Sequence, residues 1–183
     1  MIRTLLIALF LMVLTDASAQ NIYKPVDDGS KVHFVIKNFG INTGGDLKGL
    51  TGTIDFDAAR FNTATINVTV NVKTIDTDNK MRDDHLRSAS YFDAEKYSSI
   101  NIKSTKITMV KDAKSQWYNF SGTLTMHGVT KNILFPFTIQ QIGKDMVFKG
   151  SFDINRSDFG VGGNGGVLGS TVKISLSVLA KRV

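Results

Sequence analysis

The 183 residues, 42% of them hydrophobic, are enough to build one domain with a sizeable core, and the formal net charge is +6. There is no cysteine, which excludes disulfide bonds, thiolate nucleophiles, cysteine-ligated zinc and a lipid-modified N-terminal cysteine. The lysines are scattered over polar faces without an arginine-rich stripe, so we interpret the charge as a solvated surface and expect no nucleic-acid partner.

Residues 1–19 are predicted to be a signal peptide rather than part of the fold. Arg3 gives the segment a positive start, residues 5–14 form an apolar run too short to span a bilayer, and residues 17–19 are small, as a signal peptidase site requires. The mature chain is therefore expected to begin at Gln20 and to form a single exported domain over residues 20–183.

Most of the remaining chain alternates between apolar and polar residues, which predicts β-strands with one dry face and one wet face. Eight strands are predicted, at about residues 32–37, 50–56, 64–73, 100–109, 117–126, 133–139, 146–154 and 172–178. The glycine-rich residues 39–49 are expected to form a loop, and residues 111–115 a polar turn. Pro136 lacks a backbone donor and is placed at an edge or a bulge.

The strand pattern is interrupted once, between Ile75 and Ile100, by a charged segment that tolerates helix. Thr77 or Asp78 could cap a helix there, so a short helical insert is predicted at about residues 77–90. Eight strands without crossover helices predict an all-β antiparallel domain, either a two-sheet sandwich or a closed barrel. Closure removes the exposed edges of long strands, so we favour the barrel, with the insert lying across one end.

Gly52, Gly122 and Gly150 occupy the apolar phase of their strands, where a packed core would place larger side chains. One interpretation is that they mark bulges or corners of the barrel. The other is that they thin the lining and leave a channel, since an eight-stranded barrel is filled by side chains or holds one small ligand. The sequence leaves both alternatives open.

Catalytic and metal-binding motifs are not found in the sequence. The glycines at 160, 162 and 165 match a dinucleotide fingerprint, but no helix pattern follows them, and the three histidines lack metal-ligand spacing. Acid, base and cation come together only in the charged cluster, which comprises Arg82, Asp83, Asp84, His85 and Arg87.

The charged cluster has two interpretations. As an enzyme site, it would use His85 as a general base oriented by a neighbouring carboxylate. As a structural feature, its residues would pair with each other and with Arg156 and Asp158 to hold the insert against the barrel. We favour the structural interpretation and predict no catalytic residues, no metal and no cofactor.

Several segments, spread in order over nearly the whole mature chain, resemble one known family, the YceI-like proteins, also called polyisoprenoid-binding lipocalin-like proteins. The matching segments are residues 34–38, 52–57, 82–88 with 91–93, 122–131 and 156–160. Two positions depart from the family pattern: Ser98 follows Tyr97 where the family often has proline, and residues 47–50 replace an aromatic-rich lip.

This resemblance implies an eight-stranded lipocalin-like barrel, usually periplasmic, that holds a long isoprenoid chain such as a quinone tail in a hydrophobic tunnel, without catalytic residues. The predicted lining residues share the apolar phase of their strands. They are Phe34, Ile36, Ile54, Phe56, Val68, Val70, Phe120, Leu124, Phe135, Phe137, Phe148, Phe152, Ile174 and Leu176. The insert is expected to gate or stopper one end.

The ligand class has alternatives. A fatty acid or a lipid amide would suit the same tube, and an enzyme acting on a lipid or small apolar substrate through His85 would share the fold. The expected partner is a long-chain isoprenoid or another lipid. Transient contact with a membrane surface and a homodimer stay open.

Overall fold

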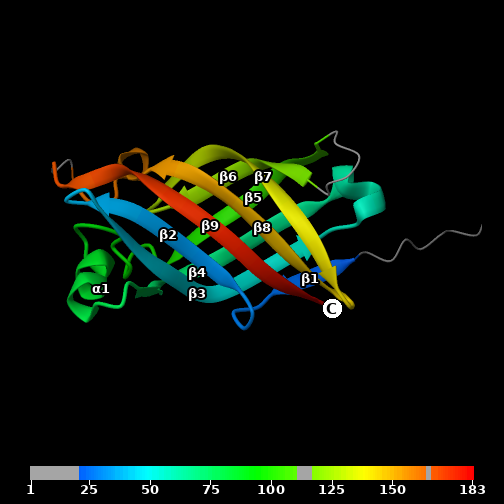
Figure 1. Ribbon diagram of the computed structural model, residues 1–183, viewed down its shortest axis with the longest axis horizontal. Coiled ribbons are helices and arrows are strands. Elements are labelled where there is room, and N and C mark those ends of the chain that lie inside the picture. Colours follow the sequence, from blue (N-terminus) through cyan, green and yellow to red (C-terminus); the bar gives the residue numbers. More distant parts are fainter. Residues whose placement is uncertain (1–20, 111–116, 164–165) are drawn as a thin grey trace, which may run out of the picture.

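The strands of the computed structural model, which describes residues 21–110, 117–163 and 166–183, close into an antiparallel β-barrel (Figure 1). The strands are β1 (Ile22–Pro25), β2 (Lys31–Asn38), β3 (Ile41–Asp55), β4 (Thr65–Asp76), β5 (Ser99–Met109), β6 (Trp117–Met126), β7 (Val129–Ile142), β8 (Asp145–Asn155) and β9 (Leu168–Arg182). One α-helix, α1 (Lys80–Arg87), and two 3-10 helices, η1 (Ala58–Thr63) and η2 (Arg156–Phe159), complete the described part. The predicted signal peptide and the turn at 111–115 lie outside the described residues.

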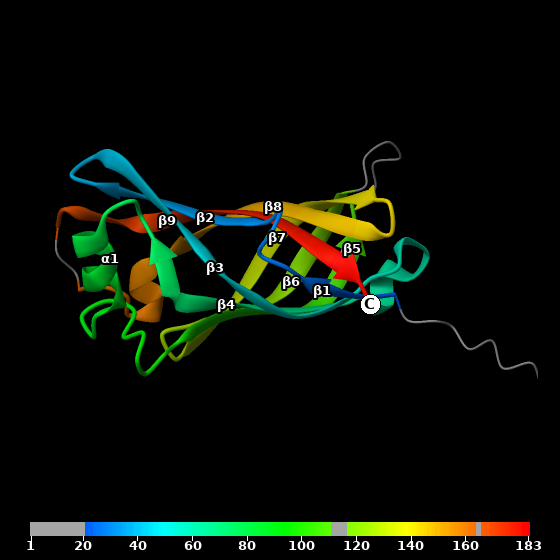
Figure 2. The ribbon, with the colours of Figure 1, turned by 90° about the horizontal axis from the view of Figure 1, so that it is seen from below.

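The described part of the barrel has nine strands, but two of them, β1 and β2, occupy the same place between β3 and β9, so the wall is eight strands around. Each strand from β2 to β9 pairs with its neighbours, and β3 pairs with β4 to close the barrel. The short β1 continues the position of β2, because Tyr23 pairs with Ile54 of β3 on one side and with Arg182 of β9 on the other. The predicted eight-stranded antiparallel barrel is therefore confirmed, and β1 was missed because four residues show too little alternation. Figure 2 shows the barrel from a second direction, with α1 at one end.

The expected loop at residues 39–49 is wrong, because β3 begins at Ile41 and pairs with β2 over that stretch. Only Phe39 and Gly40 form the turn, both with positive φ, 50° and 77°. Gly45 belongs to β3. This position suits glycine because a Cβ there would come within 2.7 Å of the Phe34 ring. Glycine at this position indicates a close approach of packed groups rather than a loop.

Of the three glycines in the apolar phase of their strands, two mark bulges and one fits a thinned lining. A Cβ on Gly52 or Gly122 would collide with a backbone carbonyl of the neighbouring strand, and the register shifts near both positions. These two glycines therefore mark bulges. Gly150 instead faces the ring of Phe135 and lines an internal cavity, so only this glycine fits the thinned lining.

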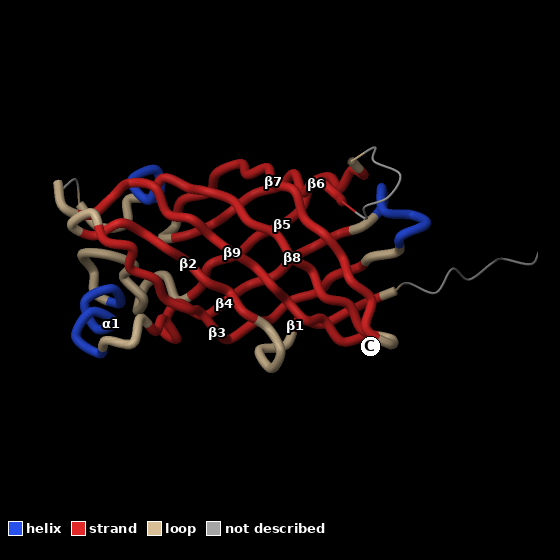
Figure 3. Tube along the Cα trace, in the orientation of Figure 1, coloured by secondary structure: helices blue, strands red, loops and turns tan. Residues whose placement is uncertain are grey.

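Aromatic rings fill the barrel end that is opposite α1, which we call the closed end. The Phe56 ring meets Tyr118 edge-on at 5.3 Å and Phe148 at 6.0 Å, and both Phe56 and Tyr118 are almost fully buried. Figure 3 shows the 3-10 helix η1 beyond the strands at this end and α1 at the other. Among the described residues, no helix has the length and apolar character needed to cross a membrane.

The buried phenol of Tyr118 should make the barrel sensitive to alkali. Burial raises the pKa of Tyr118 above its ordinary value of about 10. The unfolded state then loses this proton first, so the stabilising contribution is complete below pH ~10 and declines as the pH rises further. Tyr118→Phe keeps the ring but removes the ionisation, so its Tm should fall less than that of the wild type between about pH 9 and 11. An equal fall in both proteins would contradict this assignment; Tyr23, whose pKa burial also raises, accounts for a residual decline.

Candidate ligand-binding tunnel

The helix α1 is held against the barrel by its own first turn. Asn79 caps it, accepting a hydrogen bond from the backbone N–H of Arg82 at 3.0 Å, so the predicted caps Thr77 and Asp78 are wrong. Thr77 is buried instead, and its N–H and hydroxyl both donate to Asp83, at 2.9 and 2.5 Å. A buried carboxylate bonded in this way fixes the helix start to the end of β4.

The charged cluster is joined by hydrogen bonds between its own side chains and with Lys80. Asp84 accepts from Lys80 at 2.6 Å and from Arg87 at 2.7 Å, and these hydrogen bonds lower the pKa of Asp84. His85 is exposed, and its ring meets Tyr91 edge-on at 4.7 Å. Within the described residues, no carboxylate hydrogen-bonds to His85, so the orientation that a general base needs is missing.

Arg156 does not pair with the cluster, which corrects one part of the structural interpretation. Its guanidinium is buried and donates to the carbonyls of the loop that leads into β9. The acceptors are Val161 at 2.8 Å, Gly162, Gly163 at 3.0 Å, Leu168 at 3.1 Å and Gly169 at 2.9 Å. The planar guanidinium has five N–H donors, which suit carbonyls that point inward from several sides. Arg156 therefore donates to this loop and not to the carboxylates of the charged cluster. Asp158 is exposed.

Three internal cavities follow one another along the barrel. An outer cavity of about 110 Å³ lies under α1, a middle one of about 90 Å³ lies inside the barrel wall, and an inner one of about 50 Å³ reaches the closed end. Leu47 and Ile174 line both the outer and the middle cavity, and Val68 and Leu176 line both the middle and the inner cavity. Since neighbouring cavities share walls, we treat them as one tunnel, whose exposed surface is almost entirely apolar.

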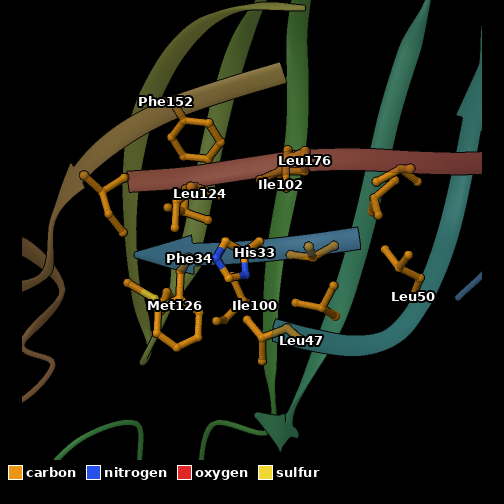
Figure 4. Close-up of a pocket in the computed structure, with 16 residues that line it drawn as sticks. His33, Phe34, Leu47, Leu50, Ile100, Ile102, Leu124, Met126, Phe152 and Leu176 are labelled. Atoms are coloured by element: carbon orange, nitrogen blue, oxygen red, sulfur yellow. The ribbon is translucent and has the colours of Figure 1, made fainter. Parts of the chain in front are cut away.

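The predicted lining residues gather around this tunnel, with Phe56 as the exception. The outer and middle cavities contain Phe34, Ile36, Val70, Leu124, Phe152 and Ile174; the inner cavity contains Ile54, Phe120, Phe135, Phe137 and Phe148; and Val68 and Leu176 lie between. Figure 4 shows Phe152, Leu124, Ile102 and Leu176 converging on the middle cavity from different strands. Phe56 lies beyond the inner cavity because it packs among the rings of the closed end.

Some lining residues were not predicted. Ile100, Ile102 and Met126 share the apolar phase of the predicted strands 100–109 and 117–126, so including every residue of that phase would have found them. Leu47 and Leu50, expected at a lip, line the middle cavity because they belong to β3. Leu86, Tyr91 and Phe92 come from the insert, and nothing in their spacing indicates that they face a cavity.

The wall beside the tunnel has a seam between β7 and β8. The two strands pair only from Phe137 with Gly150 to Ile142 with Asp145, so residues 129–136 of β7 have no partner on β8. This agrees with the predicted edge position of Pro136. Stacking of Phe135 on Phe152, with centroids 4.6 Å apart, bridges the seam instead. The wall is held there by side chains rather than by a backbone ladder.

The strands and the cavities define the class of a closed antiparallel β-barrel with an apolar interior space. The chain belongs to the YceI-like domain family, whose model matches residues 23–180. A UPF0312 protein of Pseudomonas savastanoi pv. phaseolicola is 34% identical over 141 residues, covering 73% of this chain and 72% of the relative.

Solved structures of similar shape agree with the family assignment. The crystal structure of Burkholderia cenocepacia BcnA has a TM-score of 0.77 and 29% identity, over 83% of this chain and 96% of that one. A Saccharophagus degradans domain described as polyisoprenoid-binding has a TM-score of 0.70 over 90% of this chain and 99% of that one, and at 13% identity it supports the fold alone.

Proposed function

We propose that this protein binds a long apolar chain, an isoprenoid or the tail of an isoprenoid quinone, in the tunnel, and that it carries or stores this lipid after export to the periplasm. The three apolar cavities that share wall residues along the barrel are the observation that supports the proposal. Each buried CH₂ contributes about 0.8 kcal/mol, so several five-carbon units offset the cost of ordering a flexible chain.

Among the described lining residues, the charged side chains Arg82 and Arg156 belong to the outer cavity, together with Asn38 and Thr43. The guanidinium groups of these two arginines donate to Thr77 and to loop carbonyls. The ligand is therefore selected by its tail, and its head group lies at or beyond the outer cavity. The fatty acid and lipid amide alternatives fit the same description. The enzyme alternative lacks support, because His85 is not among the residues that line the three cavities.

Solvent extraction of the purified protein tests the proposal. The full chain is prepared without detergent, extracted with organic solvent and analysed by mass spectrometry, and an added quinone of eight isoprene units serves as a second probe. We expect a co-purified prenyl lipid, or uptake of the added quinone at about one per chain. A clean extract together with no uptake would overturn the proposal.

A further inference from the structure

Large apolar side chains are exposed at the α1 end of the barrel. The exposed fractions are 73% for Phe39, 71% for Ile41, 83% for Met81 and 51% for Val167, and we call these four residues the docking rim. Phe39 donates its N–H to the carbonyl of Val167 at 2.9 Å, which joins the β2–β3 turn to the start of β9. The turn, α1 and the start of β9 all lie at one end in both views (Figures 1 and 2).

The backbone of Phe39 is in a conformation that is uncommon for a bulky side chain. Its φ is +50°, in a two-residue hairpin turn where asparagine or glycine is preferred and a bulky aromatic is uncommon. Packing of the ring could compensate for this, but the side chain is mostly exposed. An uncommon backbone conformation that holds an aromatic ring out in solvent favours a contact of this ring outside the chain.

The docking rim surrounds the outer end of the tunnel. Asn38 and Leu168, which directly flank Phe39 and Val167, line the outer cavity, and so does Arg82, the neighbour of Met81. The opposite end is filled by the rings of Phe56 and Tyr118. A water-insoluble chain that leaves a bilayer would therefore meet the rim first and the tunnel directly behind it.

We propose that the docking rim inserts into the surface of a lipid bilayer, so that the tunnel opens toward the membrane. The proposal rests on the proposed function for its purpose. The rim is made by separate tips, namely the β2–β3 turn, α1 and the residue before β9, and separate apolar tips suit a fluid interface better than the surface of a folded protein. Charges of both signs, Lys37, Lys80 and Asp78, lie beside it, so binding should depend little on anionic lipid.

Flotation of the full chain with vesicles tests the docking rim. The probes are vesicles of phosphatidylcholine alone and with phosphatidylglycerol. Asparagine adopts positive φ readily, so Phe39→Asn keeps the turn, and combined with Ile41→Thr it should lower the vesicle-bound fraction by about tenfold without lowering the Tm. The matched controls are Leu134→Thr, at a residue 70% exposed on the barrel wall, and Ile142→Thr, at a residue 52% exposed in β7.

The controls should bind vesicles as the wild type does. Loss of binding in a control equal to that in the rim variant, or no loss in the rim variant, would overturn the proposal. So would a wild-type protein that ignores vesicles and forms a dimer that Phe39→Asn dissociates, as measured by light scattering. Extraction of the same samples separates the two proposals: a rim variant that keeps its lipid in solution but no longer floats supports docking, whereas vesicle binding by a protein that takes up no lipid would overturn the carrier function alone.

Discussion

Replacement of Ile174 by tryptophan should abolish binding of the apolar chain and leave the barrel folded. Ile174 lies at the junction of the outer and middle cavities and is only half-buried, so an indole there would project into empty space. Because Ile174 lines both cavities, a block at this residue should exclude any tail longer than the outer cavity. Overpacking costs about 1–3 kcal/mol in a filled core, and the free volume at this site should reduce that cost.

Binding of the eight-unit quinone measures the effect, and we expect the affinity to fall by more than about tenfold. Lys173→Trp is the matched control, because the neighbouring residue of β9 is exposed on the opposite face of the strand. The control should bind as the wild type does. Full binding by Ile174→Trp, with a Tm close to that of the wild type, would place the ligand outside the tunnel.

The fold was predictable where residues alternate, because a half-buried wall imposes period two on its strands. The strands β4 and β6 follow this rule, with valine or isoleucine facing inward along β4. The errors at β1 and at the start of β3 have a common cause. At both places pairing with distant strands, rather than local propensity, decides the structure: β1 closes a position shared with β2, and Gly45 makes room for Phe34.

The tunnel was predictable only in part, for the same reason. Phase identifies which side of a strand is dry, and this placed Val68 and Leu176 correctly at the cavity walls. The phase does not reveal where along the barrel the packed rings end and the cavities begin. Phe56 was therefore predicted to line the tunnel, although it packs among the rings of the closed end. The depth of each residue depends on strand tilt and register, which local sequence does not encode.

The two ends of the barrel are built differently. The closed end concentrates the aromatic packing around Tyr118, and aromatic side chains bury large apolar areas. The α1 end is built from a short helix, a turn and a loop whose side chains cover the outer cavity. Elements of this kind open locally at lower free energy than paired strands, so a gate at this end would not require the barrel itself to loosen.

Arg156→Met should be the most damaging substitution at the α1 end. The change removes the guanidinium that donates to the inward-facing carbonyls of the loop, among them those of Val161 and Leu168, while keeping a side chain of similar length. Hydrogen bonds to a charged group contribute about 1.5–3 kcal/mol each, and stranded acceptors lose their solvation, so we expect the free energy of unfolding to fall by about 3–5 kcal/mol. That is a large share of the roughly 5–15 kcal/mol that stabilises a domain.

Denaturant unfolding measures this loss, and two further variants identify its cause. Arg156→Lys keeps the charge but not the planar fork, so it should recover little of the stability if the geometry of the donors matters. Lys80→Met removes a cation whose side chain is 87% exposed and should change stability little. Recovery by lysine, or a loss below about 1 kcal/mol in Arg156→Met, would mean that charge or water, rather than the guanidinium fork, holds the loop over the tunnel.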